Sequence, residues 1–488
     1  MTDWVWLQRS LPENITGADL WESLYADEPI TALLESPATV PSKLARYSIA
    51  AGKPRQVWTP EVGKILPCLE KMRSRMQPSR NPQDLPNHLP FTGGYLGWLG
   101  YDFAWEIERL PYTKPDTLPF PVAFWYEPSS FAVLDHQTQK IWLAASDNRE
   151  LTELSDRLSF GFSQKNQTLP LSKAETKTTF SPEQLQRIGS SPSAETNLTF
   201  SPEQLQRVVS PPLAGIQPTY SPEQQGYETM VEKAKKHIYA GDIFQANLSM
   251  RFGYPWTSDG WQLYRHLQKI NPSPFASYWR TTWGEVISVS PERLVSLRDR
   301  HAETRPIAGT RPRGKDKQQD LEFERELLAC TKEQAEHIML VDLERNDLGR
   351  VCEWGSIKVD ELLAIERYSH VMHLVSNVVG TLRSDRTFVD LIRATFPGGT
   401  ITGCPKVRCM EIVEKLEPQR RSLFYGSCGY IDRRGNMDLN ILIRTLLKTD
   451  NHIWGQVGAG IVADSVSDRE WHESLQKAQA QLAALGLI

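Results

Sequence analysis

The chain lacks the features that mark a nucleic-acid-binding, membrane or secreted protein. Its 488 residues carry 55 Lys and Arg against 59 Asp and Glu, a net charge of −4, so no basic excess favours a nucleic-acid partner. It has no apolar run of about 18 residues, and the N-terminus MTDWVWLQRS lacks a positive region followed by an apolar segment. We therefore expect no membrane span and no secretory signal, and a cytoplasmic location.

Cysteine is also scarce. The six cysteines include no C-x-x-C pair, and they are too sparse for a disulfide framework in a chain of this length. We expect all of them to be reduced thiols rather than disulfide partners or the ligands of a structural metal.

Composition divides the chain into three regions. Residues 1–163 alternate short apolar runs with Pro and Gly, which predicts a β-rich region of the main fold. Residues 164–219 are rich in Ser, Pro, Thr and Gln and contain FSPEQLQR twice, at Phe180–Arg187 and Phe200–Arg207. Because these copies have too little apolar content to stack as a solenoid, we expect a disordered linker. Residues 220–488 form the predicted catalytic domain.

A third copy of the repeat, YSPEQ, opens this domain and predicts a helix with Ser221 as its N-cap. Strand-like runs then follow one another directly, which favours mixed or antiparallel sheets with flanking helices, an α+β fold. The expected apolar stripe of the first helix is Tyr227, Met230, Val231, Ala234 and Ile238. The expected strands are VISVS, AIERYSHVMHLVSNVVG, YGSCGYID, LNILIRTLL and HIWGQVGAGIVAD.

Two further helices present pairs of carboxylates. Ser467 and Glu470 predict a capping box at the start of the last helix, and Glu470 and Glu473 share a face of it. Glu333 and Glu336 have the same spacing in TKEQAEHIML. Two such pairs could hold a hard divalent cation such as magnesium, although on spacing alone solvated helix faces are the simpler explanation. The expected buried stripes are Trp471, Leu475, Ala478, Leu482 and Leu485 in the last helix, and Leu328, Thr331, Ala335 and Ile338 in the other.

Two further motifs bear on ligand binding. FPGGTITGCPK contains G-x-x-x-x-G, but Cys404 and Pro405 separate the second glycine from Lys406, so the pattern does not predict a phosphate-binding loop. Arg444 lies in the apolar run ILIRTLL, where a guanidinium needs an anionic partner. That partner is either a ligand carboxylate or an acidic side chain of the chain itself.

A series of motifs runs along the chain in a specific order: GDIFQANLS, SVSPERL, RPIAGTRPRG, EQAEHIMLVDLERNDLGRV, HVMHLVSNVVGTL, FPGGTITGCPKVR, YGSCGYI, GNMD, IRTLL and VGAGIVADS. This order resembles the chorismate-utilising family, which includes anthranilate synthase component I, aminodeoxychorismate synthase component I, and isochorismate and salicylate synthases. FPGGTITG, MEIVEKLEPQRR, GNMD and GIVADS are most similar to the aminodeoxychorismate synthase branch, and the anthranilate synthase branch comes next. The resemblance implies large antiparallel sheets packed on each other with helices outside.

The resemblance also implies roles for individual residues. Glu336 and Glu473 match the magnesium ligands, with Glu333 and Glu470 beside them. Glu292 matches the general acid, whose pKa burial should raise. The positions that match those near the departing C4 hydroxyl are His373 and Thr400. The positions that match those binding the substrate carboxylates are Tyr425, Arg444, Gly458, Gly460 and Lys477.

Three features distinguish branches of the family. Gln245 stands where water-using members carry the lysine that activates water, which favours ammonia as the nucleophile. Ala308 stands where many aminodeoxychorismate synthases carry a nucleophilic lysine that attacks C2. Leu34, Glu35 and Ser36, in LLES, resemble the tryptophan-binding motif of anthranilate synthases.

These features predict amination of chorismate to 4-amino-4-deoxychorismate for 4-aminobenzoate and folate synthesis. Conversion of chorismate to anthranilate and pyruvate is the alternative. No glutaminase nucleophile motif is evident, so we expect ammonia from a separate glutamine amidotransferase subunit. A non-catalytic tryptophan-binding regulatory paralogue is a hypothesis of another class, which the complete set of motif glutamates argues against.

Deletion of residues 173–212 should leave folding and catalysis nearly unchanged. The two repeat copies lack an apolar surface to bury, and each doubling of loop length costs only about 0.6 kcal/mol. Thermal melting and turnover of the shortened chain measure this, and a melting temperature many degrees lower would mean that the repeats are packed.

Overall fold

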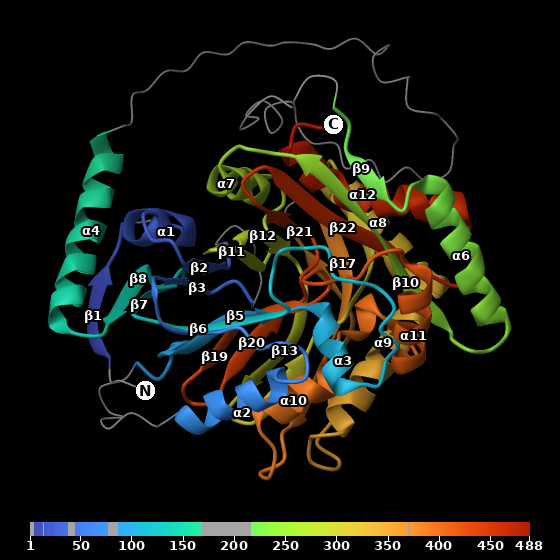
Figure 1. Ribbon diagram of the computed structural model, residues 1–488, viewed down its shortest axis with the longest axis horizontal. Coiled ribbons are helices and arrows are strands. Elements are labelled where there is room, and N and C mark those ends of the chain that lie inside the picture. Colours follow the sequence, from blue (N-terminus) through green and yellow to red (C-terminus); the bar gives the residue numbers. More distant parts are fainter. Residues whose placement is uncertain (1–3, 13, 38–43, 77–85, 168–215, 369–370) are drawn as a thin grey trace.

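Two large antiparallel sheets form the body of the protein, and helices surround them (Figure 1). The computed structural model describes residues 4–12, 14–37, 44–76, 86–167, 216–368 and 371–488. One sheet has 12 strands and the other has 10. The predicted α+β fold is therefore confirmed.

The strands and helices have the following bounds. The 12-stranded sheet runs in the order β1 (Val5–Ser10), β8 (Lys140–Ala145), β7 (Ser130–Asp135), β3 (Tyr47–Ala51), β2 (Thr31–Glu35), β11 (Phe275–Thr281), β12 (Gly284–Ser290), β21 (Thr445–Lys448), β22 (His452–Ile461), β10 (Gln245–Pro255) and β18 (Gly403–Cys404), with β9 (Thr219–Ser221) beside β10. The 10-stranded sheet runs in the order β15 (Ile307–Pro312), β17 (Val371–Thr381), β14 (His301–Thr304), β13 (Arg293–Arg298), β20 (Met437–Asn440), β19 (Ser427–Asp432), β5 (Gly94–Leu99), β6 (Ala123–Pro128) and β4 (Pro54–Trp58), with β16 (Lys358–Arg367) beside β17. The helices are α1 (Gly17–Tyr25), α2 (Ile65–Arg75), α3 (Ala104–Ile107), α4 (Asn148–Gln167), α6 (Gln224–Tyr239), α7 (Gly260–Ile270), α8 (Lys317–Ala329), α9 (Thr331–Gly349), α10 (Phe388–Thr395), α11 (Lys406–Leu416) and α12 (Ser467–Ala484), with the 3-10 turns η2 (Tyr101–Phe103) and η4 (Gly399–Ile401).

Both sheets combine strands from the two ends of the chain. In the larger sheet β2 pairs with β11, and in the smaller sheet β5 pairs with β19. Helix α4 continues to Gln167, past the expected start of the linker. The two repeat copies at 180–187 and 200–207 lie outside the described residues.

Side chains alternate between the two faces along each strand and so form two layers of hydrophobic core. Ala32 and Leu447 belong to the cluster between the sheets, whereas their neighbours Leu33 and Leu446 belong to the cluster under the outer helices. Successive side chains of a strand point to opposite faces, and both faces of the larger sheet are apolar here. Helices α1, α7 and α12 therefore cover a face that water would otherwise reach.

The helix patterns were right for two helices, although both predicted caps were wrong. In α6, four of the five predicted stripe positions are buried. In α12 and its C-cap residue Leu485, four of the five predicted positions are also buried. Ser221 ends β9, and Glu223 is the N-cap of α6. Val466 is the N-cap of α12, and the Ser467 hydroxyl donates to Glu232 at 3.0 Å, because α6 packs against this end of the helix.

The stripe predicted for α9 was wrong, although the helix exists. Leu328 and Ile338 are 38% and 44% exposed. The helix buries another face, which contains His337, Leu340, Val341, Leu343, Glu344, Asp347 and Leu348. Three of these side chains are polar, so the apolar pattern does not reveal the buried face.

Two of the predicted strands were also wrong in extent. The run LNILIRTLL divides into β20 of one sheet and β21 of the other. The run AIERYSHVMHLVSNVVG contributes to β16 and β17, which pair as an antiparallel hairpin.

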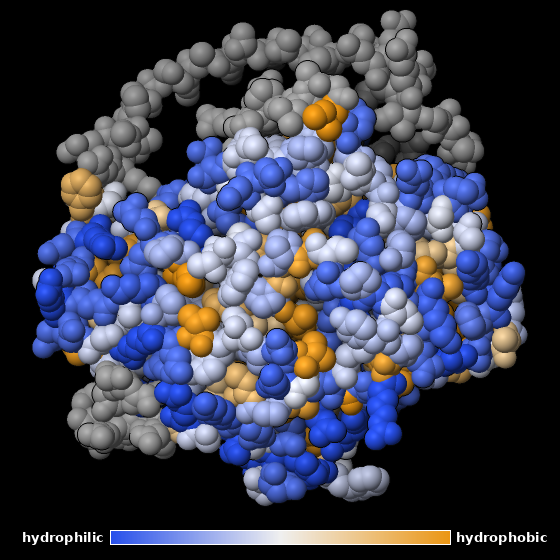
Figure 2. Space-filling view, viewed as in Figure 1, coloured by the Kyte–Doolittle hydropathy of each residue, from blue (hydrophilic) through white to orange (hydrophobic). Residues whose placement is uncertain are grey.

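The face in Figure 2 is mostly hydrophilic, with hydrophobic residues in small groups. Within the described ranges, no helix is long and apolar enough to cross a membrane. All six cysteines are free thiols, as predicted.

Candidate active site

Two segments cross between the sheets side by side. The segment around Glu292 connects β12 to β13, and residues 441–444 connect β20 back to β21. The Ile441 amide donates to the Glu292 carbonyl oxygen at 3.0 Å, and the Val289 amide donates to the Arg444 carbonyl oxygen at 3.2 Å. Arg444 has φ of 50°, a conformation that few L-residues adopt. The paired crossing brings an acidic and a basic side chain together.

Glu292 is buried beside Thr400 and Arg444. Burial raises the pKa of its carboxyl group to about 7, although the nearby Thr400 hydroxyl and the charge of Arg444 partly oppose this shift. Burial lowers the pKa of Arg444. Glu292 can therefore hold a proton near neutral pH, as the sequence predicted.

His373 reaches the same region from β17. Its Nδ1 lies 2.9 Å from Thr310 Oγ1, and burial, followed by the charge of Arg444, lowers its pKa to about 3. The imidazole is therefore neutral near pH 7. Tyr368, His373 and Arg444 line a small cavity together with the 271–274 segment.

Glycines bring β22 close to β10. A Cβ atom on Gly458 would lie 2.2 Å from the Leu248 carbonyl oxygen, and one on Gly460 would lie 2.2 Å from Gln245 Nε2. A larger residue would clash with the backbone at position 458, whereas at position 460 the Gln245 side chain would have to move. Lys477 of α12 donates to the Gly458 carbonyl oxygen at 3.0 Å, which places its ammonium group beside this glycine-rich strand.

Tyr425 lies beside the crossing. Its amide donates to the Leu442 carbonyl oxygen at 3.0 Å, its φ is 63°, and burial raises the pKa of its phenol. The phenol therefore stays neutral and can act as a hydrogen-bond donor.

Ala308 occupies β15 opposite Leu374, the neighbour of His373. Its methyl group can neither attack carbon nor carry a proton. This position supplies no nucleophile to the cavity that Arg444 and His373 line.

The four predicted metal-site glutamates come from α9 and α12. Burial raises the pKa of Glu336, and repulsion from Glu473, Glu333 and Glu470 adds to the shift. Burial also raises the pKa of Glu470. The two helices therefore bring these carboxylates near enough to interact electrostatically.

Basic side chains form ion pairs with three of these glutamates. Arg311 contacts Glu333 at 2.9 Å, and Lys332 lies 3.9 Å from Glu336. Lys477 contacts Glu473 at 2.9 Å and lowers its pKa. In the described part of the chain, no group of three or more His, Cys, Asp and Glu side chains is close enough together to hold a metal ion. The all-carboxylate donor set still has the chemistry of a site for a hard cation.

The LLES motif lies at the end of β2 beside a cavity of about 110 Å³. Leu34, Glu35 and Ser36 line it, with Tyr47, Pro274, Phe275, Tyr430, Asp438 and Asn440 among the other lining residues. The Glu35 oxygens accept from the Ala18 amide at 2.8 Å and from Tyr264 and Gln268 at 2.7 Å each. Glu35 therefore holds the end of β2 in place beside the cavity.

Sequence reasoning missed several residues around the site. Tyr368 lines the cavity with His373, and its neighbourhood in RYSHVMHL could have indicated it. Glu344 is buried near Glu292 and Asp347, and burial raises its pKa to about 8. Only the fold reveals Glu344, because the chain pattern there predicts an ordinary helix position.

Comparison with known proteins identifies the family. The family model for chorismate binding enzymes matches residues 31–483, and the chain belongs to this family. Within it, the chain is a component I protein of the anthranilate and aminodeoxychorismate synthase group, as its relatives show.

Three relatives define that group. An anthranilate synthase component I-like protein of Synechocystis is 53% identical over 99% of this chain and 92% of its own length. Aminodeoxychorismate synthase component 1 of Bacillus subtilis is 42% identical over 81% and 78%. Anthranilate synthase component 1 of Synechocystis is 38% identical over 96% and 93%.

A solved structure confirms the fold. Anthranilate synthase component I of Streptococcus pneumoniae matches with a TM-score of 0.71 at 28% identity, over 97% of this chain and all of that one.

The raised pKa of Glu292 predicts a pH-dependent cost to stability. Its folded pKa of about 7 exceeds the ordinary value of 4.5, so the folded state binds the extra proton between these values. The free energy of unfolding should fall by about 3 kcal/mol through this group as pH rises from 5 to 8. In Glu292→Gln this contribution disappears, so the variant should gain stability relative to the native chain as pH rises. Denaturant melts at both pH values measure the difference, and an unchanged difference would contradict the raised pKa.

Proposed function

We propose that this enzyme aminates chorismate to 4-amino-4-deoxychorismate, with ammonia from a separate glutamine amidotransferase subunit. We base the choice of product on the unequal sequence identity of this chain to two proteins of one organism. The chain is 53% identical to the Synechocystis component I-like protein but 38% identical to the anthranilate synthase component 1 of that organism. A chain devoted to anthranilate should resemble the second protein more. The 42% identity to a Bacillus aminodeoxychorismate synthase supports the same choice.

Glu292 would protonate the departing C4 hydroxyl, which leaves as water. Its buried carboxyl group keeps a proton up to about pH 7, as a general acid requires. Thr400 lies beside this carboxyl, and its hydroxyl oxygen is buried without a hydrogen-bond partner among the described residues, so it would be available to bind the leaving oxygen. His373, held neutral by burial, would contribute a hydrogen bond rather than a second positive charge.

Positively charged side chains and hydrogen-bond donors would bind the two substrate carboxylates. Arg444 and Lys477 offer positive charge, and the Tyr425 phenol and the backbone of Gly458 and Gly460 offer hydrogen-bond donors. Because Arg444 faces a partly neutral Glu292, its charge remains available to a ligand anion.

Ammonia is the nucleophile that suits this site. The neutral amide of Gln245, with its side-chain nitrogen against Gly460, cannot take a proton from water. Ammonia needs no such base, since it is nucleophilic as delivered. With alanine at position 308, ammonia would replace the C4 hydroxyl directly: the C4–N bond forms as the C4–O bond breaks, and the hydroxyl leaves as water with the proton from Glu292. The proton lost by the new amine returns to Glu292, which restores the acid.

Magnesium would bind Glu336 and Glu473, with Glu333 and Glu470 around them. Once bound, the metal supplies positive charge that holds and orients the ring carboxylate of chorismate. The mutual repulsion that raises the pKa of Glu336 would be relieved by a cation. Lys332 and Lys477 would then be free to turn from the carboxylates they now contact.

Anthranilate synthesis is the second candidate, and the cavity beside LLES favours it. Tryptophan would occupy that cavity with its indole against Leu34 and Tyr47, while Ser36 would help to set its rim. A tryptophan site fits feedback control of an enzyme that makes a tryptophan precursor.

Removal of one metal-site carboxylate should abolish most activity. Glu336→Gln or Glu473→Gln should lower turnover of chorismate by about 10- to 100-fold or more, because the remaining donors hold the cation poorly. Turnover across a magnesium titration measures this, and saturation should need more magnesium in each variant. Asp342→Asn is the matched control, since it removes a carboxylate from α9 that is 75% exposed. Full activity of the native enzyme in excess chelator would exclude the magnesium site.

Product analysis separates the two candidates. Purified enzyme with chorismate, magnesium and ammonium should yield a product that an added aminodeoxychorismate lyase converts to 4-aminobenzoate. Anthranilate formed without the lyase, with no 4-aminobenzoate in its presence, would establish the second candidate. A lack of any chorismate turnover, together with tryptophan binding, would favour the regulatory paralogue.

A further inference from the structure

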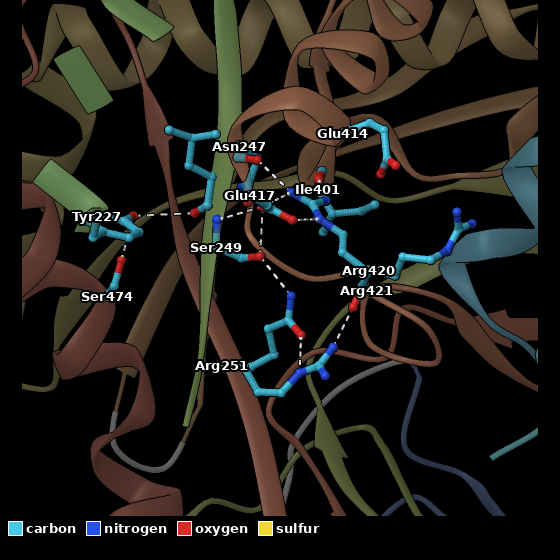
Figure 3. Close-up of polar contacts among 12 residues, drawn as sticks. Tyr227, Asn247, Ser249, Arg251, Ile401, Glu414, Glu417, Arg420, Arg421 and Ser474 are labelled. Atoms are coloured by element: carbon cyan, nitrogen blue, oxygen red, sulfur yellow. Dashed lines mark hydrogen bonds and ion pairs between the residues drawn. The ribbon is translucent and has the colours of Figure 1, made fainter. Parts of the chain in front are cut away.

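A buried ion pair lies directly behind the candidate site. Glu417 and Arg421 are four residues apart in the segment that follows α11, and they are 3% and 2% exposed. Arg421 Nε donates to Glu417 Oε2 at 3.0 Å, and Nη2 donates to Oε1 at 2.7 Å. This two-point contact fixes the plane of the guanidinium group, which Figure 3 draws among its partners.

The same guanidinium joins three segments that carry site residues. Its Nη1 donates to the Ile401 carbonyl oxygen at 2.7 Å, and Nη2 donates to the Asn247 carbonyl oxygen at 2.7 Å. Its carbon lies 4.7 Å from the centre of the Tyr425 ring. Ile401 follows Thr400 in η4, and the Asn247 side chain donates to the Thr400 carbonyl oxygen at 3.2 Å.

Glu417 completes the connection to the glycine-rich strand. Its Oε1 accepts from the Ser249 amide and hydroxyl, both at 2.8 Å (Figure 3). In the β10–β22 ladder, Ser249 is opposite Gly458 and Asn247 is opposite Gly460. One ion pair therefore connects the Thr400 turn to the strand opposite the two glycines.

We propose that Arg421, oriented by Glu417, is a positioning residue that fixes Thr400 relative to β10 and Tyr425. The proposal rests on the proposed function for the role of Thr400 at the leaving group. The claim that Arg421 holds the η4 turn in place does not depend on which reaction the site catalyses.

The two connected segments differ in how much they depend on Arg421. Strand β10 pairs with β22 along nearly its whole length, so the loss of one contact leaves it in register. The turn η4 has three residues, and its other ties to β10 are the Asn247 side chain and the two-residue strand β18 that follows the turn. Loss of the guanidinium should displace Thr400 and spare the glycine backbone, so kcat should fall while KM changes little.

Arg420 provides a matched control. It is 3% exposed, and its Nε donates to the buried Asp102 at 2.7 Å. Its guanidinium stacks on Trp105 and Tyr112, each at 4.1 Å. Its side chain has none of the contacts that Arg421 makes with the site segments, so Arg420→Lys loses a comparable buried guanidinium elsewhere.

The test compares Arg421→Lys with Arg420→Lys in the full chain. Both should melt at lower temperature than the native protein. Only Arg421→Lys should lower kcat, by about 10- to 100-fold, the scale of an ångström-sized misplacement, with KM changed by less than about 3-fold. Hydrogen exchange at residues 398–403 should accelerate in Arg421→Lys and stay unchanged in Arg420→Lys.

A double-variant cycle decides whether Arg421 acts through Thr400. In a Thr400→Ala background, Arg421→Lys should cost little further kcat, because the positioned hydroxyl is already gone. Equal losses of kcat in both backgrounds, or unchanged exchange at 398–403, would overturn the proposal. Hydrogen exchange needs no turnover, so failure of the proposed function would leave this part of the test intact.

Discussion

The paired crossing of two strands between the sheets is the constraint on which the site depends. One two-stranded ribbon, β12 with β21, continues into the other sheet as β13 with β20. The ladder of hydrogen bonds is interrupted where the ribbon bends, so the Glu292 and Arg444 side chains need not follow the alternating directions of a flat strand. A sheet interior normally excludes such groups because desolvation is costly. Here the two crossing segments satisfy each other's backbone groups and leave the side chains for chemistry.

Burial then assigns each group its charge state. At Glu292 desolvation outweighs the charge of Arg444, and the pKa rises to about 7. Glu473 is next to Lys477, and its pKa falls. The same residue type can therefore hold a proton at Glu292 and stay ionised at Glu473. A substrate that loses a hydroxyl and carries carboxylates needs both.

The sequence predicted the parts of this arrangement that recur as local patterns. Apolar spacing located α6 and α12, and motif order located Glu292, His373, Thr400 and Arg444 at positions that the fold brings together. Local patterns could not predict that LNILIRTLL changes sheets, since its apolar residues suit either sheet. They also failed for α9, because Lys406 neutralises Asp347 at 2.5 Å from a distant part of the chain. The contacts of Arg421 were equally hidden, since two of its partners are backbone carbonyl groups that no side-chain pattern encodes.

The Glu417–Arg421 pair illustrates why a buried ion pair persists in such a site. Replacement of a buried pair by apolar residues of similar volume is often neutral or stabilising, so stability alone does not explain it. An apolar pair could fill the volume but could not donate to the Ile401 and Asn247 carbonyl oxygens or accept from Ser249. Those backbone groups would then be buried without partners, at about 1–3 kcal/mol each. The turn would move to recover them, and Thr400 would move with it. The ion pair is therefore best explained by the geometry that it imposes on the backbone groups of Ile401, Asn247 and Ser249.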